Sequence, residues 1–256
     1  PLPQPIRIAD DFEERHAIRP DLGYRLGLDD RQVRAKLSEL ASDWQDLRLD
    51  EEPQQPADPR FMGAWMQHRE VFGYTLRAEL VWQLKHAIEE NPDEFDLGAA
   101  VQHLLVDEYQ DLNKCDLAVV AAIASAGAEV YCAGDDDQSI YSFRGAYPEG
   151  IRAFATQFEP CTPLALEVCW RSDRSVIQLG QYVANLDPDR LPKPIVPRPD
   201  AGDGEVHLLR FADQFSEAGG VAAICQHLIL HTGMNPDDIL ILLRGDHQGR
   251  YSTPIR

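Results

Sequence analysis

Apolar residues recur at helical spacing through roughly the first hundred positions. On the helix predicted over 31–47, the residues that share one face are Val33, Leu37, Leu40, Trp44 and Leu47. The pattern resumes over 61–91, either as one long helix or as two helices broken near Gly73, and it ends before Pro92. Prolines within 51–59 predict a loop between these two regions.

The rhythm changes after residue 100. Short apolar runs typical of strands lie at 101–107, 128–134, 162–168, 205–211 and 237–244. Helical patterns lie between them, at 115–127, 147–158, 175–186 and 216–233. This alternation predicts an α/β fold with parallel sheets covered by helices, behind a helical N-terminal segment. The proline-rich stretch 187–204 is expected to be an excursion or a domain boundary.

Composition narrows the class of protein. The chain has 256 residues and a formal net charge of −19, which argues against non-specific binding to nucleic acid or to anionic membranes. The arginines of 138–174 still permit a local neutral-to-basic groove. No run approaches the about 20 apolar residues of a membrane span. The five cysteines form no C-x-x-C pair, so reduced thiols and a cytoplasmic location are expected.

The first candidate chemistry lies in "HLLVDEYQD", residues 103–111, where an apolar run ends in Asp107 and Glu108. Ligands of open parallel sheets bind beyond the carboxyl ends of the strands. One carboxylate at such a place can hold Mg²⁺, and its neighbour can orient or deprotonate a water molecule. A solvated acidic loop after a buried strand is the alternative. Asp116, further along, is expected to help start the next helix.

Two later stretches repeat this design. In "AEVYCAGDDDQSIYSFRGA", residues 128–146, Gln138 follows a strand-like run and can bind a phosphate oxygen or a water. The residues beyond it that suit stacking on single-stranded nucleic acid are Tyr141, Phe143 and Arg144. A core Tyr/Phe pair with a surface arginine is the alternative. In "LALEVCWRSD", Trp170 can stack on adenine and Arg171 can reach phosphate oxygens.

In this order, the three stretches resemble motifs II, III and IV of the UvrD/Rep/PcrA family of superfamily 1 DNA helicases. "LLVDEYQD" is similar to the DEFQD or DEYQD of motif II, and "GDDDQSIYSFRGA" to the GDxDQSIYxWRGA of motif III. "EVCWRSD" is similar to the QNYRS of motif IV. Phe143 stands where the family usually has Trp, and Trp170 where it usually has Tyr. Both replacements keep an aromatic face.

The resemblance implies a role for each residue. Asp107 would bind Mg²⁺, and Glu108 would be the catalytic base. Gln138 would sense the γ-phosphate of ATP, Trp170 would stack on the adenine, and Arg171 would act as an arginine finger. The residues that would contact single-stranded DNA are Tyr141, Phe143 and Arg144. The function implied is ATP-driven 3′-to-5′ translocation on single-stranded DNA, with duplex unwinding at junctions.

The resemblance also implies a division of the chain into RecA-like parts. Residues 1–60 would be a helical insert, 61–165 the later half of motor domain 1A, and 166–256 the start of motor domain 2A. The phosphate-binding motif G-x-x-x-x-G-K-[ST] is absent, because the residues that follow the four lysines are Leu37, His86, Cys115 and Pro194. The chain is therefore expected to be an internal helicase segment with little ATPase activity of its own.

Two other functions remain open at this point. The first is a truncated or degenerate helicase-like module that binds DNA or protein partners without hydrolysing ATP. The second is a metal-dependent nuclease built on the acidic cluster, although the separate carboxylate–lysine motif of helicase-associated nucleases is not in the sequence.

Overall fold

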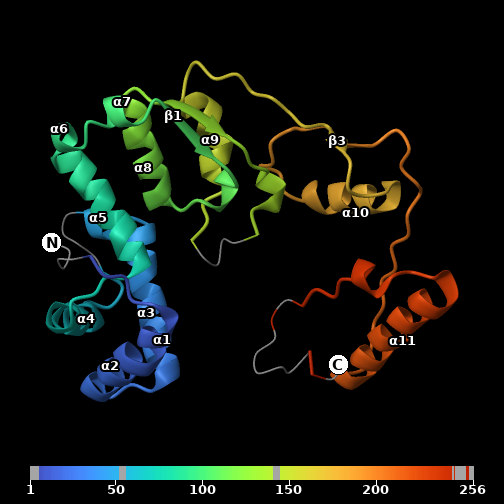
Figure 1. The fold of residues 1–256 in the computed structure, drawn as a ribbon, viewed down its shortest axis with the longest axis horizontal. Coiled ribbons are helices and arrows are strands. Elements are labelled where there is room, and N and C mark those ends of the chain that lie inside the picture. Colours follow the sequence, from blue (N-terminus) through green and yellow to red (C-terminus); the bar gives the residue numbers. More distant parts are fainter. Residues whose placement is uncertain (1–5, 52–55, 141–144, 244, 246–251, 254–256) are drawn as a thin grey trace. The chain divides into compact units, whose positions relative to one another are not determined.

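The computed structural model describes residues 6–51, 56–140, 145–243, 245 and 252–253 (Figure 1). The chain divides into two compact units. The first comprises residues 1–167 together with 180–195, and the second comprises 168–179 together with 196–256. Residues 180–195 are therefore an excursion of the chain, whose neighbours on both sides belong to the second unit.

The N-terminal part of the first unit is helical, as the sequence predicted. Its elements are α1 (Asp11–Glu13), a π-helical turn (Glu14–Ile18), α2 (Arg19–Leu26), α3 (Asp30–Gln45), a 3₁₀ turn (Arg48–Asp50), α4 (Pro59–Phe72), α5 (Arg77–Glu90), α6 (Pro92–Phe95) and α7 (Leu97–Ala100). The predicted break near Gly73 is confirmed, because Gly73 ends α4 in the left-handed conformation at φ 65°. Leu47, predicted to lie on α3, follows its end instead.

Helices α2, α3, α4 and α5 pack around one apolar core. Its largest members include Trp44 of α3 and Trp65 of α4, whose rings meet edge to face at 5.0 Å. Val33, Leu37 and Leu40 are buried beside them. The shared helix face that the spacing indicated is thus the core-facing side of α3.

The second part of the first unit holds a two-stranded parallel sheet. The elements of this part are β1 (His103–Val106), a 3₁₀ turn (Tyr109–Asp111), α8 (Lys114–Ser125), β2 (Glu129–Cys132), a second 3₁₀ turn (Asp136–Gln138) and α9 (Glu149–Gln157). β1 and β2 pair in register, with Leu105 opposite Tyr131. Parallel pairing requires a crossover, which α8 supplies.

One face of this sheet is covered and the other is open. Leu104 and Val106 pack with Leu117 of α8 and Phe154 of α9 into a second core. Leu105, which points the other way, is 72% exposed. The open face therefore exposes the side chains of Leu105 and Tyr131 beside the polar pair His103 and Glu129.

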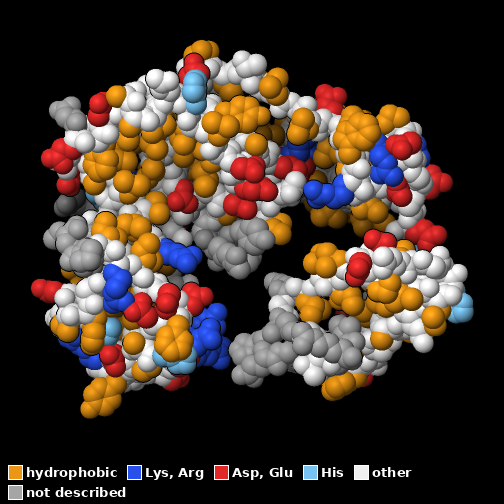
Figure 2. All heavy atoms as spheres, viewed as in Figure 1, with side chains coloured by type: hydrophobic (Ala, Val, Ile, Leu, Met, Phe, Trp, Pro, Cys, Tyr) orange, Lys and Arg blue, Asp and Glu red, His pale blue; other side chains and the backbone are white. Residues whose placement is uncertain are grey.

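The second unit contains less regular structure than the sequence predicted. Its described elements are β3 (Val168–Cys169), the first part of α10 (Arg174–Ala184), β4 (Val196–Pro197), α11 (Gln214–Thr232) and a 3₁₀ turn (Pro236–Asp238). β3 pairs with β4 in parallel. In Figure 2, apolar side chains gather on the visible surface over α11.

Three strand predictions were wrong in whole or in part. Of 162–168, Val168 alone enters a strand, and the described residues of 205–211 and 237–244 form none. Leu208, Leu240 and Leu242 in these runs are strongly exposed. Strands need neighbours for their backbone N–H and C=O groups, and an apolar pattern does not supply them.

The fold is thus a mixed helical and parallel-sheet structure, which agrees with the predicted α/β class. None of the helices in the described ranges is both long and apolar enough to cross a bilayer.

Candidate functional site

The candidate site is at the carboxyl ends of β1 and β2. Because the strands are parallel, both end at the same edge of the sheet. The N–H of Ala133 donates to the carbonyl of Val106 at 2.8 Å, and the N–H of Tyr109 donates to the carbonyl of Ala133 at 3.0 Å. These bonds hold together the start of two loops, 107–111 and 133–138.

Asp107 and Glu108 lead the first loop, and both are exposed. Oδ1 of Asp107 accepts a hydrogen bond from the N–H of Glu108 at 2.9 Å. Glu108 has the left-handed conformation, with φ 51° and ψ 43°. For a residue with a side chain, this conformation costs about 1–2 kcal/mol, and such strain often accompanies functional sites.

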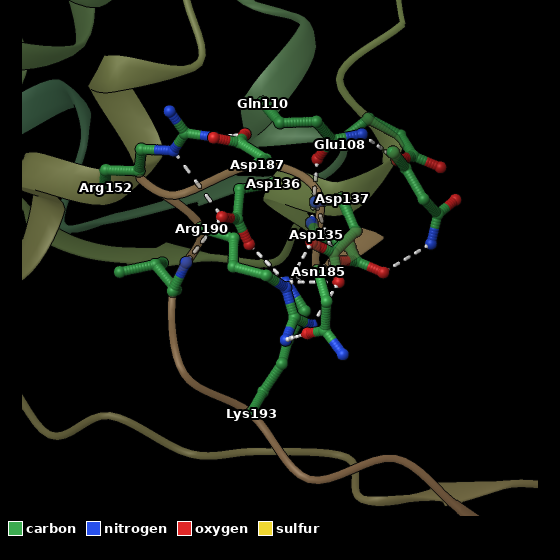
Figure 3. Close-up of polar contacts among 12 residues, drawn as sticks. Glu108, Gln110, Asp135, Asp136, Asp137, Arg152, Asn185, Asp187, Arg190 and Lys193 are labelled. Atoms are coloured by element: carbon green, nitrogen blue, oxygen red, sulfur yellow. Dashed lines mark hydrogen bonds and ion pairs between the residues drawn. The ribbon is translucent and has the colours of Figure 1, made fainter. Parts of the chain in front are cut away.

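Gln110 connects the two loops. Its side chain is buried, and its Nε2 donates to Oε2 of Glu108 at 2.7 Å. Its Oε1 accepts from the N–H of Asp135 at 3.0 Å. One amide thus bridges the carboxylate of the first loop and the backbone of the second (Figure 3).

Close packing around the Gln110 amide explains why residue 134 is a glycine. A Cβ at this position would lie 2.6 Å from Oε1 of Gln110 and 2.7 Å from Cδ1 of Ile151. The backbone of the second loop can therefore approach Gln110 this closely only without a side chain.

Gln138 ends the 3₁₀ turn of the second loop and is exposed. Its Nε2 donates to Oδ2 of Asp135 at 2.8 Å. A continuous chain of hydrogen bonds therefore runs from Glu108 through Gln110 and Asp135 to Gln138. The predicted DNA-contacting residues Tyr141, Phe143 and Arg144 lie outside the described residues.

The acidic turn of the second loop is the one cluster, among the described residues, whose geometry could hold a metal ion. The carboxylate oxygens of Asp135, Asp136 and Asp137 lie within 4.8 Å of one another. However, Nζ of Lys193 lies 2.8 Å from Oδ1 of Asp135 and 3.1 Å from Oδ2 of Asp137, and it bonds to Oδ1 of Asp136 as well. A lysine ammonium already supplies the positive charge there.

The pKa shifts agree with charge pairing in this turn. The hydrogen bonds from Arg190 hold the pKa of Asp137 below its ordinary value, against the opposing effect of burial. Burial by itself lowers the pKa of Lys193, but its hydrogen bonds to the three carboxylates outweigh burial and raise it. The aspartates of the turn are thus paired with the cations of Arg190 and Lys193. Asp107, the residue predicted to bind Mg²⁺, is an exposed carboxylate at the end of β1 and lies outside this cluster.

Trp170 and Arg171 follow β3 in the second unit, and both are exposed. Asp107, Glu108 and Gln138 belong to the first unit. The structure therefore brings three of the predicted site residues together at one sheet edge and presents the other two at the end of a different sheet.

Two other residues of this region, Asp116 and Tyr109, have structural roles. Asp116 forms a capping box with Asn113: its N–H donates to Oδ1 of Asn113 at 3.0 Å, and its Oδ2 accepts from the N–H of Asn113 at 3.2 Å. The predicted helix-starting role of Asp116 is confirmed. Tyr109 is a core residue, with its ring edge to face against Phe154 at 5.2 Å.

Sequence reasoning missed three contributors to the site. The sequence patterns assigned no role to Gln110, and Lys193 and Arg190 lie in the stretch 187–204, which was predicted to be an excursion or a domain boundary. A glutamine two positions after a strand-end carboxylate is a signal for Gln110, although its burial depends on the second loop. For the two cations, the signal is a pair of basic residues among prolines in an acidic chain.

Comparison with known proteins supplies independent information. Residues 2–159 match the family described as "UvrD/REP helicase N-terminal domain". DNA helicase II of Haemophilus influenzae is 35% identical over 149 residues, which cover 58% of this chain and 20% of that protein. ATP-dependent DNA helicase Rep of Escherichia coli is 32% identical over 152 residues, which cover 59% of this chain and 22% of that protein.

ATP-dependent DNA helicase PcrA of Leuconostoc citreum is 30% identical over 149 residues, covering 58% of this chain and 20% of that protein. The chain spans about a fifth of the length of these curated relatives.

Proposed function

The chain belongs to the UvrD/REP helicase N-terminal domain family, and on this premise we propose that it is part of an ATP-dependent DNA helicase. The proposed activity couples ATP hydrolysis to 3′-to-5′ movement on single-stranded DNA and to unwinding at duplex junctions. The observation that carries the proposal is the hydrogen-bond chain Glu108–Gln110–Asp135–Gln138, which links the carboxylate of motif II to the glutamine of motif III.

In this proposal, Glu108 is the general base. Its carboxylate is exposed, and Gln110 holds one of its oxygens at 2.7 Å. Glu108 can therefore be held in a fixed direction while it accepts a proton from an attacking water. Asp107, its neighbour, would hold Mg²⁺, which when bound neutralises charge on phosphate oxygens.

Gln138 is proposed to report the state of the γ-phosphate. Its amide donates to Asp135, so the same N–H group can exchange that partner for a phosphate oxygen. Such an exchange would alter the contacts of the whole second loop, which continues toward Tyr141, Phe143 and Arg144. These three residues are proposed to contact single-stranded DNA by stacking and by charge.

Trp170 and Arg171 complete the proposal from the second unit. The exposed indole would stack on adenine, and the guanidinium would donate to phosphate oxygens during hydrolysis. This assignment treats residues 61–165 and 166–256 as parts of two RecA-like motor domains, 1A and 2A, behind a helical insert at 1–60. A cytoplasmic location, in keeping with five free cysteines, is part of the same proposal.

The 256-residue chain by itself is proposed to hydrolyse ATP little or not at all, because its four lysines lie outside any phosphate-binding loop sequence. The alternative is a helicase-like module that binds DNA or protein without ATPase activity. The two differ in whether a G-K-[ST] loop accompanies these residues in the complete chain.

The test is DNA-dependent ATPase activity in a chain that carries residues 1–256 together with a phosphate-binding loop. Glu108→Gln keeps the size of the side chain and removes its basicity. We expect a loss of kcat of about 100-fold or more, with KM for ATP little changed. Glu94→Gln, at an exposed position in α6, is the matched control. Unchanged turnover in Glu108→Gln would remove Glu108 from the proposed role.

A further inference from the structure

The excursion of the chain at 180–195 contacts the motif III turn. We define residues 187–193 as the strap. In the strap, Arg190 forms two parallel bonds with Asp137: Nε lies 3.0 Å from Oδ1, and Nη2 lies 2.7 Å from Oδ2. Its Nη1 donates to Oδ1 of Asn185 at 2.9 Å. This bidentate geometry fixes the direction of the carboxylate as well as its charge.

Asp136 is bound by the strap still more completely. Its side chain is buried, and Oδ2 accepts from the N–H of Leu191 at 2.7 Å. Oδ1 pairs with Nζ of Lys193, and Nε of Arg152 lies 3.5 Å from Oδ2. Arg152 also reaches Asp187, at the start of the strap, at 2.6 Å (Figure 3). One end of the strap, Lys193, therefore bonds to the buried Asp136, and the other end, Asp187, bonds to Arg152, which lies beside Asp136.

Lys193 connects these contacts to the proposed catalytic residues. Asp135, which pairs with Lys193 at 2.8 Å, also accepts the amide of Gln138, and its N–H donates to Gln110. Gln110 in turn holds Glu108. A displacement of Lys193 would therefore change the surroundings of Asp135, and through it the two residues that are proposed to act on ATP.

Along the chain, the strap lies between two segments of the second unit. Residues 168–179 and the chain from 196 onward belong to that unit, whereas 180–195 belong to the first. The contacts of the strap with the motif III turn are therefore contacts within the first unit.

We propose that Arg190 and Lys193 are positioning residues, and that the strap holds the motif III turn in the geometry that the proposed reaction needs. The proposal deepens the proposed function and rests on it where ATP hydrolysis is concerned. Neither residue contacts a reacting group. Arg190 acts through Asp137, and Lys193 acts through Asp135, Asp136 and Asp137. These aspartates keep the turn of Gln138 in place.

The first experiment measures hydrogen exchange of the amides of 135–139 in the 256-residue chain, and it requires no ATPase activity. We expect Lys193→Met to increase exchange there about tenfold or more, because the buried Asp136 loses its ammonium partner. Lys36→Met is the matched control, since Lys36 also pairs with two carboxylates, Glu39 and Asp58, but on the helical part. An increase no larger than in the control would overturn the proposal.

The second experiment separates positioning from stability. In a chain that also carries a phosphate-binding loop, Lys193→Met should lower kcat for ATP about 10- to 100-fold while KM changes less than about threefold. Adding Asp136→Asn removes the unpaired charge but keeps an acceptor for the N–H of Leu191. The double variant should therefore regain ATPase activity, and hydrogen exchange of the amides of 135–139 should return toward the rate of the parent chain. Increased exchange with unchanged kcat, or no recovery in the double variant, would refute the positioning role.

The two hypotheses fail differently. If Glu108→Gln retains full turnover, the catalytic assignment is wrong, whereas the exchange result still decides whether the strap holds the turn. If Glu108→Gln is inactive but Lys193→Met behaves like Lys36→Met in both assays, the strap proposal alone is wrong.

Discussion

The bridging amide of Gln110 leads to a prediction about charge and pH. Gln110→Glu keeps the shape of the side chain and the acceptor for the N–H of Asp135. It replaces the N–H donor to Glu108 with a second carboxylate at the same place, where the present separation is 2.7 Å. Two carboxylates at this distance cannot both stay ionised without a large cost.

The size of the effect follows from two limits. Two unit charges 2.7 Å apart repel by about 6 kcal/mol at an effective dielectric constant of about 20. Taking up a proton instead costs about 1.4 kcal/mol for each pH unit above the ordinary glutamate pKa of about 4.3, hence about 4 kcal/mol at pH 7. The smaller of these two energies, about 4 kcal/mol, is the upper limit of the loss of stability at pH 7. Because Glu108 is exposed and screened by water, we expect a loss of about 2–4 kcal/mol at pH 7.

The sign of the pH dependence is fixed by the same argument. The folded variant has a carboxyl pKa raised above the unfolded value, so its penalty is complete above the folded pKa and disappears below the unfolded pKa. Near pH 4 a proton is shared between the two carboxylates, and the difference from the parent chain should fall below about 1 kcal/mol. The variant is therefore expected to recover as the pH is lowered.

The assay is urea denaturation at pH 7 and pH 4, followed by the fluorescence of the buried Trp44 and Trp65 and by the far-ultraviolet circular dichroism of the first unit. Gln157→Glu, on the exposed side of α9, adds the same charge away from the bridge and is the matched control. The free energies of unfolding of Gln110→Glu and Gln157→Glu are compared at each pH. If the difference between the two variants is the same at pH 7 and pH 4, the hydrogen bond between Gln110 and Glu108 does not stabilise the site as argued.

Two further predictions concern the second loop, 133–138. Gly134→Ala should destabilise the chain by about 1–3 kcal/mol, because its Cβ would lie 2.6 Å from the amide oxygen of Gln110. The control is Gly63→Ala in α4, where a Cβ would have no atom within 4 Å, and it should stabilise the chain by about 0.5–1 kcal/mol. Equal changes of the two variants in a thermal melt would contradict the packing argument. Asp137→Asn should lower the free energy of unfolding at pH 7, since Arg190 depresses the pKa of Asp137 and the contribution is present above about pH 3.8. The difference from the parent chain should vanish as the pH falls through the depressed pKa, and a difference that is independent of pH between 7 and 3 would show that the ion pair contributes nothing.

The sequence was most informative where structure is local. Three predictions depend on residues a few positions apart: the face of α3, the break near Gly73 and the helix-starting role of Asp116. The structure agrees with the face except at Leu47, with the second of the two alternatives at Gly73, and with the role of Asp116. The resemblance of motifs II and III to the UvrD/Rep/PcrA helicases is confirmed at the level of the family. The parallel order of β1 and β2 also followed from the alternation of strands and helices.

The sequence was least informative where structure depends on distant partners. The run at 205–211 has the apolar character of a strand, but within the described residues nothing pairs with it. Lys193 meets Asp136 across 57 positions, and no local pattern indicates that contact. Gln110 is buried beside Gly134 and Asp135, which follow β2 and lie more than 20 positions further along the chain. The bridge and the strap were therefore beyond the reach of periodicity and motif spacing.

The excursion of residues 180–195 has a practical consequence for dividing this protein. The two units are interleaved along the chain, so no single cut separates them. A truncation after Glu167 would retain the aspartates of the motif III turn and discard the lysine and arginine that neutralise them, leaving a buried anion beside the site. A shortened form that keeps this region intact must extend through Ile195, which includes about half of α10 from the other unit.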